Sequence, residues 1–351
     1  MHIYQELRVG MTYDLKSDYL VRGYSEEESA EFDSEDTIDA IENVLTRMGF
    51  QVDRIGNIHA LVERLAEGCR WDLVFNICEG MGGSAREAQV PCLLDAYKIP
   101  YVFSEAAVLS LALNKSMTKE MIRANGIHTA PSFLIHDLNR LDERALQFPL
   151  FLKPSMEGSS KGIHSDCKVS TPAEFYQTAR RILRETSGPI LAETYLPGPE
   201  FTVGLMGEGE HARVLGVMEV VFKNNGLPPI YCYETKLAYL DCIEYRMADQ
   251  GLGSRIGEAA LGAWRALGCR DGGRVDLRLD EQGVPHFIEV NPLPGLHPKS
   301  SDLVILARMS GYSYFELVSG IVEQALPRLA KTRHAEDAFT QSSFEFVCGL
   351  M

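Results

Sequence analysis

The chain has 351 residues, with 34 lysines and arginines against 49 aspartates and glutamates, so its net charge near pH 7 is −15 (34 − 49). This balance argues against a nucleic-acid or membrane binder, because the positive patch that such proteins use is missing. No apolar run approaches the ~18 residues that span a bilayer, and the N-terminal residues lack a signal peptide's apolar core. Eight scattered cysteines without a CxxC pair favour buried, reduced thiols. We therefore expect a cytoplasmic protein of two or three domains.

The first hundred residues alternate predicted strands with predicted helices. We expect strands at 7–14, 71–78 and 99–103, and helices at 36–49 and around 86–97. The helix at 36–49 shows apolar residues at helical spacing and stops at Gly49, a common C-terminal cap. Strands joined by crossover helices form a parallel sheet. The acidic stretch at 25–36 is interpreted as a solvated loop or the start of a helix.

Antiparallel strands and further helices are predicted in the rest of the chain. We expect a helix from 113 to Asn125-Gly126, strands at 148–155, 189–196, 200–207 and 212–222, mostly loop at 223–249, a helix at 254–267, a hairpin at 273–291, and helices at 301–310 and 313–330. The last residues, 331–351, are interpreted as a tail.

The hairpin at 273–291 carries a polar face. Side chains alternate along a strand, so Arg274 and Asp276 share a face, as do Glu289 and Asn291. Pairing across the turn would bring three oxygen ligands and a guanidinium together. Such oxygen donors suit Mg²⁺, which combines a few carboxylates with phosphate oxygens and water. An ordinary hairpin with a solvated polar face would show the same pattern.

Two lysines and two glutamates are candidates for a phosphate or nucleotide site. Lys153 ends an apolar strand and precedes the Gly/Ser-rich PSMEGSSKG, whose N–H groups and hydroxyls can surround phosphate oxygens. This segment is not a Walker sequence. Lys115 opens a helix and offers a second cation. Glu193 and Glu200 flank a predicted hinge at 197–199. The plain alternatives are a surface lysine and surface acids around a turn.

Taken in order, these segments resemble one family. Asn114-Lys115, FLKPSMEGSSKG, AETYLPGPEFTVG and GGRVDLRLD…FIEVNPLPG resemble the ATP-grasp superfamily and, within it, the D-alanine–D-alanine ligase branch, over about residues 71–328. The resemblance implies an α/β fold, α+β in part. It also implies an N-terminal parallel-sheet domain (1–104), a central lid domain (105–192), a C-terminal catalytic domain (193–330) and the tail (331–351).

The resemblance also implies roles for individual residues. ATP would be bound by Lys115, Lys153, Glu157, Ser159, Ser160, Glu193, Leu196 and Glu200, where the two lysines hold phosphates, Glu193 and the backbone near Leu196 read the adenine, and Glu200 reads the ribose. Asp276, Glu289 and Asn291 would hold two Mg²⁺, with Mn²⁺ as an alternative. Catalytic roles fall on Arg274 and the Gly295 N–H as oxyanion donors and on Lys236 of a closing loop. Ser300 and Ser301 match positions that hold the carboxylate of the second amino acid.

Three departures from the family concern the amino-substrate side. The N-terminal glycine-rich stretch with a Ser and a Glu is absent, and the segment reads VGMTYDLKSDYLVRGYSEEE. NICEGMGGSAREAQ replaces a His-Gly pair and a Gly-Glu-Asp-Gly run, and Leu237 stands where tyrosine is common. We therefore expect Glu79, Arg86 and Glu87 to define a different first substrate. The alternative for these three residues is that they form a helix N-terminal cap and surface ion pairs. For Leu237, the alternative is a packing role without a function in substrate choice.

Three functions follow, in order of preference. The first is an ATP-dependent carboxylate–amine ligase that joins two amino acids or amino-acid-like substrates through an acyl phosphate. The second is a true D-alanine–D-alanine ligase of cell-wall synthesis. The third is a nucleotide-binding protein without ligase activity, against which stands the complete set of Arg274, Asp276, Glu289 and Asn291. The expected partners are small amino-acid substrates, and a homodimer is expected by analogy with the family.

Overall fold

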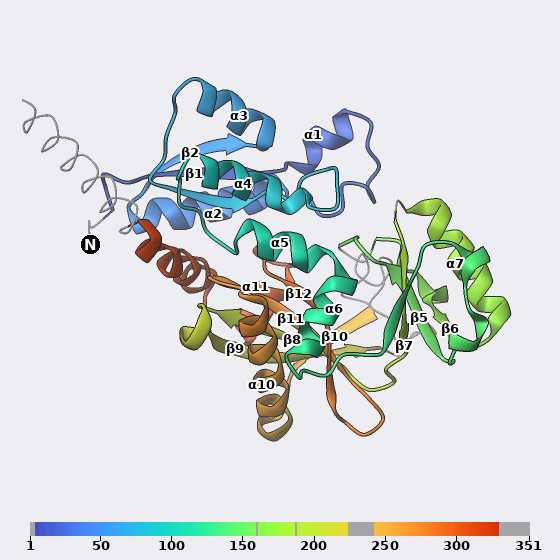
Figure 1. Cartoon of the computed structure of the whole chain (residues 1–351). Helices are drawn as coiled ribbons and strands as arrows, with labels where there is room; N and C mark the ends of the chain where they lie inside the picture. The colour runs from blue at the N-terminus through green and yellow to red at the C-terminus, as the bar shows by residue number, and fades with distance from the viewer. Residues whose placement is uncertain (1–3, 159–160, 187, 224–241, 330–351) are drawn as a thin grey trace, which may run out of the picture.

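The computed structural model of the chain describes residues 4–158, 161–186, 188–223 and 242–329. These residues form three β-sheets with helices packed around them (Figure 1). The predicted tail therefore lies outside the described residues, as does most of the predicted loop at 223–249. No helix in the described residues is both long and apolar enough to cross a membrane.

The N-terminal sheet is parallel, as the sequence predicts. Its order is β2-β1-β3, and its elements are β1 (Arg8–Tyr13), β2 (Gln51–Gly56) and β3 (Leu73–Ile77), with helices α1 (Lys16–Val21), α2 (Glu35–Met48), α3 (Ile58–Ala66) and α4 (Gln89–Ala96). Gly49 caps α2 with φ of 102°, a conformation that glycine adopts without steric cost. The strand expected at 99–103 is wrong, because only an isolated bridge between Val74 and Tyr101 forms there.

The acidic stretch at 25–36 consists of turns whose end is the start of α2, so the interpretation as a helix start holds for its last residues, whereas the solvated loop is wrong for Glu31. The side chain of Glu31 is only 4% exposed. Cations from two distant segments reach it, namely Arg86 and Lys161. A buried carboxylate is tolerated where cations compensate its charge, and the local sequence around residue 31 does not contain these cations.

The central sheet is antiparallel with the order β4-β7-β5-β6. Its strands are β4 (Ser132–Ile135), β5 (Leu150–Pro154), β6 (Lys168–Val169) and β7 (Ile190–Thr194), and α7 (Pro172–Glu185) packs beside it (Figure 1). Thr171 caps α7 through its hydroxyl, and Pro172 occupies the first turn, where a missing N–H costs nothing. Phe175 and Ile182 of α7 are fully buried in the core of this unit.

The C-terminal sheet has five strands in the order β10-β9-β8-β11-β12. They are β8 (Glu200–Met206), β9 (Arg213–Phe222), β10 (Ile243–Met247), β11 (Gly272–Leu279) and β12 (Pro285–Asn291), with α5 (Ala106–Leu113), α6 (Lys115–Ala124), α10 (Gln250–Leu267), α11 (Asp302–Met309) and a helix at 314–329 around them. The hairpin is confirmed, since β11 pairs antiparallel with β12. The sequence misses β10, which pairs with β9 and lies at the edge of the sheet among the strands that the structure describes.

The central and C-terminal sheets are joined at β12. The Phe287 N–H donates to the carbonyl of His128 (2.8 Å), and the Thr129 hydroxyl donates to the carbonyl of Phe287 (2.9 Å). Near the start of α6, the Lys115 N–H donates to the carbonyl of Ser155 just after β5 (3.0 Å). These bonds hold the end of β5 against the polar hairpin.

Candidate active site

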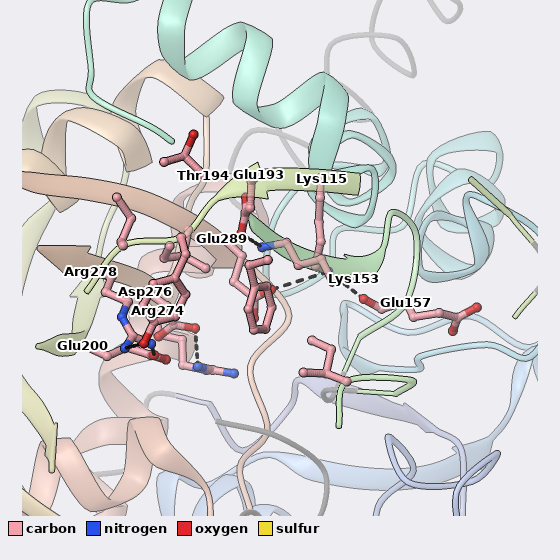
Figure 2. A pocket seen from close by; sticks show the side chains of 15 residues that line it. Lys115, Lys153, Glu157, Glu193, Thr194, Glu200, Arg274, Asp276, Arg278 and Glu289 are labelled. Carbon is pink, nitrogen blue, oxygen red and sulfur yellow. Dashed lines mark hydrogen bonds and ion pairs between the residues drawn. The ribbon is translucent and has the colours of Figure 1, made fainter. Parts of the chain in front are cut away.

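A cleft of about 800 Å³, partly open to solvent, lies between the central sheet and the C-terminal sheet (Figure 2). Six of the eight residues expected to bind ATP line it: Lys115, Lys153, Glu157, Glu193, Leu196 and Glu200. Arg274, Asp276 and Glu289 of the hairpin line it as well. The other two expected ATP residues, Ser159 and Ser160, lie outside the described residues, as do Lys236 and Leu237.

Glu193 lines this cleft and forms ion pairs with two lysines, of which Figure 2 shows Lys153. Its Oε1 lies 2.8 Å from the Lys153 ammonium, and its Oε2 lies 2.9 Å from that of Lys119. Burial raises the pKa of Glu193, but the charges of Lys119 and Lys153 outweigh burial and lower this pKa to about 2. Glu193 is therefore a fixed anion at neutral pH.

Lys119 is a residue that sequence reasoning missed. Its side chain is fully buried, and its ammonium also donates to the Thr129 hydroxyl (2.7 Å). The signal was available in the helical spacing, because Lys119 lies four residues after Lys115 and three before the buried Ile122 on α6. A lysine on the buried face of a helix needs an acid, which Glu193 provides.

Lys115 connects the glycine-rich loop with the hairpin. Its ammonium donates to the carbonyl of Glu157 (2.5 Å) and lies 3.4 Å from Glu289 Oε2. The lysine is 7% exposed, so the alternative of a surface lysine is wrong. Its position gives the junction between loop and hairpin a positive charge that phosphate oxygens could use.

The hairpin places the expected metal ligands side by side. Asp276 stands directly across from Glu289. Its carboxylate accepts from Arg274 (2.5 Å), the Asn291 amide (3.2 Å) and the Thr202 hydroxyl (2.8 Å). Burial raises the pKa of Asp276 to about 7, and the charge of Glu289 adds to this effect while Arg274 opposes it.

This donor set fits Mg²⁺. In the described part of the chain, no three or more Asp, Glu, His or Cys side chains converge into a metal cluster. The hairpin instead supplies two crowded carboxylates and one amide oxygen. Mg²⁺ is bound in this way where phosphate oxygens and water complete its coordination, and a cation would relieve the repulsion between Asp276 and Glu289.

Glu200 pairs with a second residue that the sequence analysis missed. The guanidinium of Arg278 lies 3.1 Å from the Glu200 carboxylate and donates to the hydroxyl of Tyr195 (3.2 Å) and the carbonyl of Gly198 (3.1 Å). Arg278 lines the cleft, and strand alternation places it on the same face as Arg274 and Asp276. Gly198 allows the close approach, since a Cβ there would lie 2.6 Å from the carbonyl oxygen of Leu279.

A second cavity adjoins the first; it has a volume of about 670 Å³, is partly open to solvent, and is lined by two of the three residues expected for the first substrate, Glu79 and Glu87. Its lining includes Glu31, Glu79, Glu87, Asn291 and Gly295. Lys115, Arg274 and Glu289 line both cavities. Burial raises the pKa of Glu79, and the charge of Glu87 adds to this; burial also raises the pKa of Glu87, to about 7.

Arg86 and Glu31 connect this cavity to the glycine-rich loop. Arg86 is 8% exposed, donates to the carbonyl of Met156 (3.1 Å) and pairs with Glu31 (3.1 Å). Lys161, from the far end of the loop, lies 2.9 Å from Glu31. A Cβ at Gly158 would lie 2.1 Å from Glu31 Oε1, so the loop passes directly over this carboxylate. The alternative of exposed surface pairs is wrong for Arg86.

Ser300 and Ser301 lie beside the second cavity without lining it. The Ser301 hydroxyl accepts from the His297 N–H (2.8 Å), and a Cβ at Gly295 would lie 3.0 Å from this hydroxyl. Ser300 is exposed, and its hydroxyl lies 2.8 Å from His297 Nδ1. Ser301 is thus next to the expected oxyanion donor, whereas Ser300 faces outward.

Comparisons with known proteins agree with this geometry. The family model described as D-ala D-ala ligase C-terminus matches residues 120–323. The D-alanine–D-alanine ligase of Bordetella avium is 35% identical over 271 residues, which cover 75% of this chain and 81% of the relative. That of Rhizorhabdus wittichii is 31% identical over 90% of this chain and 98% of its own. An uncharacterized protein of Sinorhizobium fredii is 32% identical over 72% of this chain and 74% of its own.

Solved structures show the same arrangement of elements. The D-alanine–D-alanine ligase of Bacillus anthracis complexed with ATP has a TM-score of 0.70 at 20% identity, covering 93% of this chain and 99% of that one. The VanG D-Ala:D-Ser ligase of Enterococcus faecalis has a TM-score of 0.70 at 19% identity, covering 92% and 100%. At these identities the likeness establishes the fold alone, and it confirms the predicted α/β, ATP-grasp architecture.

Proposed function

We propose a reaction for this chain on the premise that it belongs to the D-alanine–D-alanine ligase family and is an ATP-dependent ligase that forms C–N bonds. In this proposal, it joins two amino acids or amino-acid-like substrates through an acyl phosphate. The observation that carries the proposal is the junction of the two cavities. Lys115, Arg274 and Glu289 line both, so a nucleotide in one cavity and a carboxylate in the other would meet there.

The nucleotide would occupy the cleft of Figure 2. Lys115 and Lys153 bind its phosphates, Glu193 and the backbone near Leu196 read the adenine, and Glu200 reads the ribose. Glu157, Ser159 and Ser160 of the glycine-rich loop cover the phosphates, and Lys236 closes the site from its own loop. Because Glu193 stays ionised and fixed by two lysines, it presents an acceptor without reorganisation.

Asp276, Glu289 and Asn291 would hold two Mg²⁺, with Mn²⁺ as an alternative ion. Ions held by these residues would supply positive charge to the phosphate oxygens during transfer. The chain's own contribution is to fix the three ligands: Thr202 and Arg274 both donate to Asp276, which orients its carboxylate toward Glu289.

The chemistry begins with the carboxylate of the first substrate. Its oxygen attacks the γ-phosphorus of ATP, the bond to ADP breaks, and an acyl phosphate forms. The amine of the second substrate then attacks the acyl carbon. Arg274 and the Gly295 N–H donate to the tetrahedral oxyanion, after which phosphate leaves and an amide remains. Ser301, beside Gly295, and Ser300 bind the carboxylate of the second substrate.

The remaining predictions stay part of this proposal. They are the division into domains at 1–104, 105–192 and 193–330, the two-metal count, a homodimer, and action in the cytoplasm, where ATP is available. Glu79, Arg86 and Glu87 set the choice of first substrate.

A second candidate is a D-alanine–D-alanine ligase of cell-wall synthesis, favoured by the D-alanine–D-alanine ligases to which the chain is 30–35% identical. The test measures phosphate release from ATP with Mg²⁺ while D- and L-amino acids are supplied singly and in pairs. Brisk release with D-alanine alone, giving the dipeptide, would establish the second candidate. Release with another pair but not with D-alanine would support a different substrate choice. Absence of release with every acid and amine would overturn the proposed reaction.

A further inference from the structure

The second cavity contains two acidic groups that have no ion-pair partner in the part of the chain that the structure describes. Glu31 is paired with Arg86 and Lys161. Glu79 and Glu87 also line the cavity, yet neither forms a hydrogen bond or an ion pair within residues 4–158, 161–186, 188–223 and 242–329. Both are half-buried. A shielded carboxylate without a cation is costly, so a ligand is the natural source of compensation.

The cations of the cavity wall are already committed. Lys115 lies 3.4 Å from Glu289, and Arg274 donates to Asp276. Of the four glutamates in the lining, Glu31 is paired with Arg86 and Lys161 and Glu289 with Lys115, so Glu79 and Glu87 are the two without an ion pair in the described residues. Burial raises the pKa of both Glu79 and Glu87, and it outweighs the opposing charge of Arg86 at both residues and of Lys115 at Glu87.

The spacing of these acids favours an organic cation over a metal ion. Glu31, Glu79 and Glu87 surround the cavity, but among the described residues no three such side chains converge closely enough to ligate a metal. The wall also has an apolar part, which includes Ala112, Leu113 and Leu293. A ligand with methylene groups and separated cationic groups matches both parts of the wall.

We infer that the first substrate is a basic amino acid, meaning a diamino or guanidino acid with a second cation on an aliphatic side chain. This inference rests on the proposed function, which places the reacting carboxylate at the junction of Lys115, Arg274 and Glu289. An α-ammonium group compensates one of the two unpaired glutamates, and the side-chain cation compensates the other. A neutral amino acid would leave one carboxylate shielded and unpaired. Glu79 and Glu87 are therefore specificity-determining residues.

The experiment traps the activated first substrate, so the second substrate need not be known. The full chain, Mg²⁺ and ATP are incubated with hydroxylamine, which displaces phosphate from an acyl phosphate and gives a hydroxamate. Both enantiomers of lysine, ornithine and arginine are compared with the neutral analogues norleucine, norvaline and citrulline. We expect kcat/KM to be about 100-fold higher for the best basic acid than for its analogue, as for a desolvated charge pair.

Two variants test the assignment to named residues. Glu79→Gln and Glu87→Gln keep the shape of the side chain and remove its charge, and each should lower the ratio of basic to neutral kcat/KM by about 10-fold. Glu63→Gln, on the exposed side of α3, is the matched control and should leave the ratio unchanged. Thermal unfolding of each variant checks that it folds, and the selectivity of the unaltered chain tests the inference independently of any variant.

The outcomes separate the inference from the proposed function. Hydroxamate formation with basic acids well above their analogues supports the inference. Equal or better hydroxamate formation with neutral acids, D-alanine included, overturns the inference but leaves the ligase reaction in place. Failure to form hydroxamate or ADP with any acid overturns the proposed function and the inference with it. An unchanged ratio in both folded glutamine variants overturns the role of Glu79 and Glu87.

Discussion

The cleft proposed for the nucleotide and the cavity proposed for the first substrate share a wall but differ in how their acidic side chains are neutralised. In the cleft, Glu193 lies between Lys119 and Lys153, and Glu200 pairs with Arg278. In the cavity, Glu79 and Glu87 have no such partner among the residues that the structure describes. The part of the cleft around Glu193 and Glu200 therefore has its charges compensated without a ligand, whereas the cavity depends on a ligand for its charge balance.

This difference indicates which of the two regions tolerates a change of a charged residue. A cleft whose acids and bases satisfy each other is rigid, and losing one partner leaves a buried charge behind. A cavity with uncompensated acids is less stable alone, but its charge can select a ligand. Among the departures from the family, Glu79 and Glu87 line the cavity, in agreement with the proposal that the nucleotide chemistry is kept and the first substrate differs.

The largest effect is expected where the two regions meet. Glu289→Gln removes a carboxylate opposite Asp276 and weakens the site for Mg²⁺, so ATP-dependent phosphate release should fall by about 10³-fold or more while the fold is retained. A coupled assay of phosphate, with circular dichroism alongside, checks this. Glu281→Gln, exposed in the turn of the same hairpin, serves as the control. Full activity in Glu289→Gln would contradict the metal assignment.

Breaking the charge balance of the cleft should cost stability. Lys119→Met leaves Glu193 with one cation in place of two, so the free energy of unfolding should drop by about 3 kcal/mol. The KM for ATP should rise by about 10-fold, because Glu193 loses its fixed position. Urea unfolding and ATP titration measure the two effects. Glu120→Gln, on the exposed face of α6, is the control, and an unfolding curve for Lys119→Met equal to that of the control would refute the comparison.

Removing an acid from the cavity should raise the free energy of unfolding, whereas Lys119→Met lowers it. The pKa of Glu87 is raised by burial from 4.5 to about 7, so the folded state holds its proton more tightly than the unfolded state. The unaltered chain, here called the parent, therefore loses stability as the pH rises from about 4.5 to about 7. The Glu87→Gln variant has no carboxyl group at this position and does not lose that stability. The variant should be more stable by about 2 kcal/mol near pH 8 and equal to the parent near pH 4.5. Urea unfolding at both pH values decides this, and destabilisation near pH 8 would be the contrary result.

The smallest effect concerns the link between the two regions. Lys161→Met removes one of two cations on Glu31 and frees the end of the glycine-rich loop, so the KM for ATP should rise about 5-fold with little change in kcat. The effect is modest because Lys161 is 15% exposed and Arg86 still pairs with Glu31. Lys16→Met, which removes a surface pair with Glu26, is the matched control. A fall in kcat with unchanged KM would show that the loop is not held through Lys161.

Most secondary structure could be predicted, because hydrophobic period and capping are local signals. The helix that Gly49 ends and the hairpin at 273–291 are examples. The strand expected at 99–103 and the missed β10 failed for a common reason, since pairing depends on a partner segment far away in the chain. In the candidate site, the hairpin face was predictable from strand alternation. Glu31 was not, because its partners Arg86 and Lys161 come from other segments.

The sequence by itself determined the family, the order of elements, and the residue types that a nucleotide and Mg²⁺ require, because these depend on short segments with a fixed spacing. Only the tertiary structure decided which charges compensate one another. It buried Lys119 against Glu193, drew Glu31 under the glycine-rich loop, and left Glu79 and Glu87 facing a shared cavity. Charge compensation acts over a few ångströms of space between residues far apart in the chain, and the sequence gives no measure of that distance.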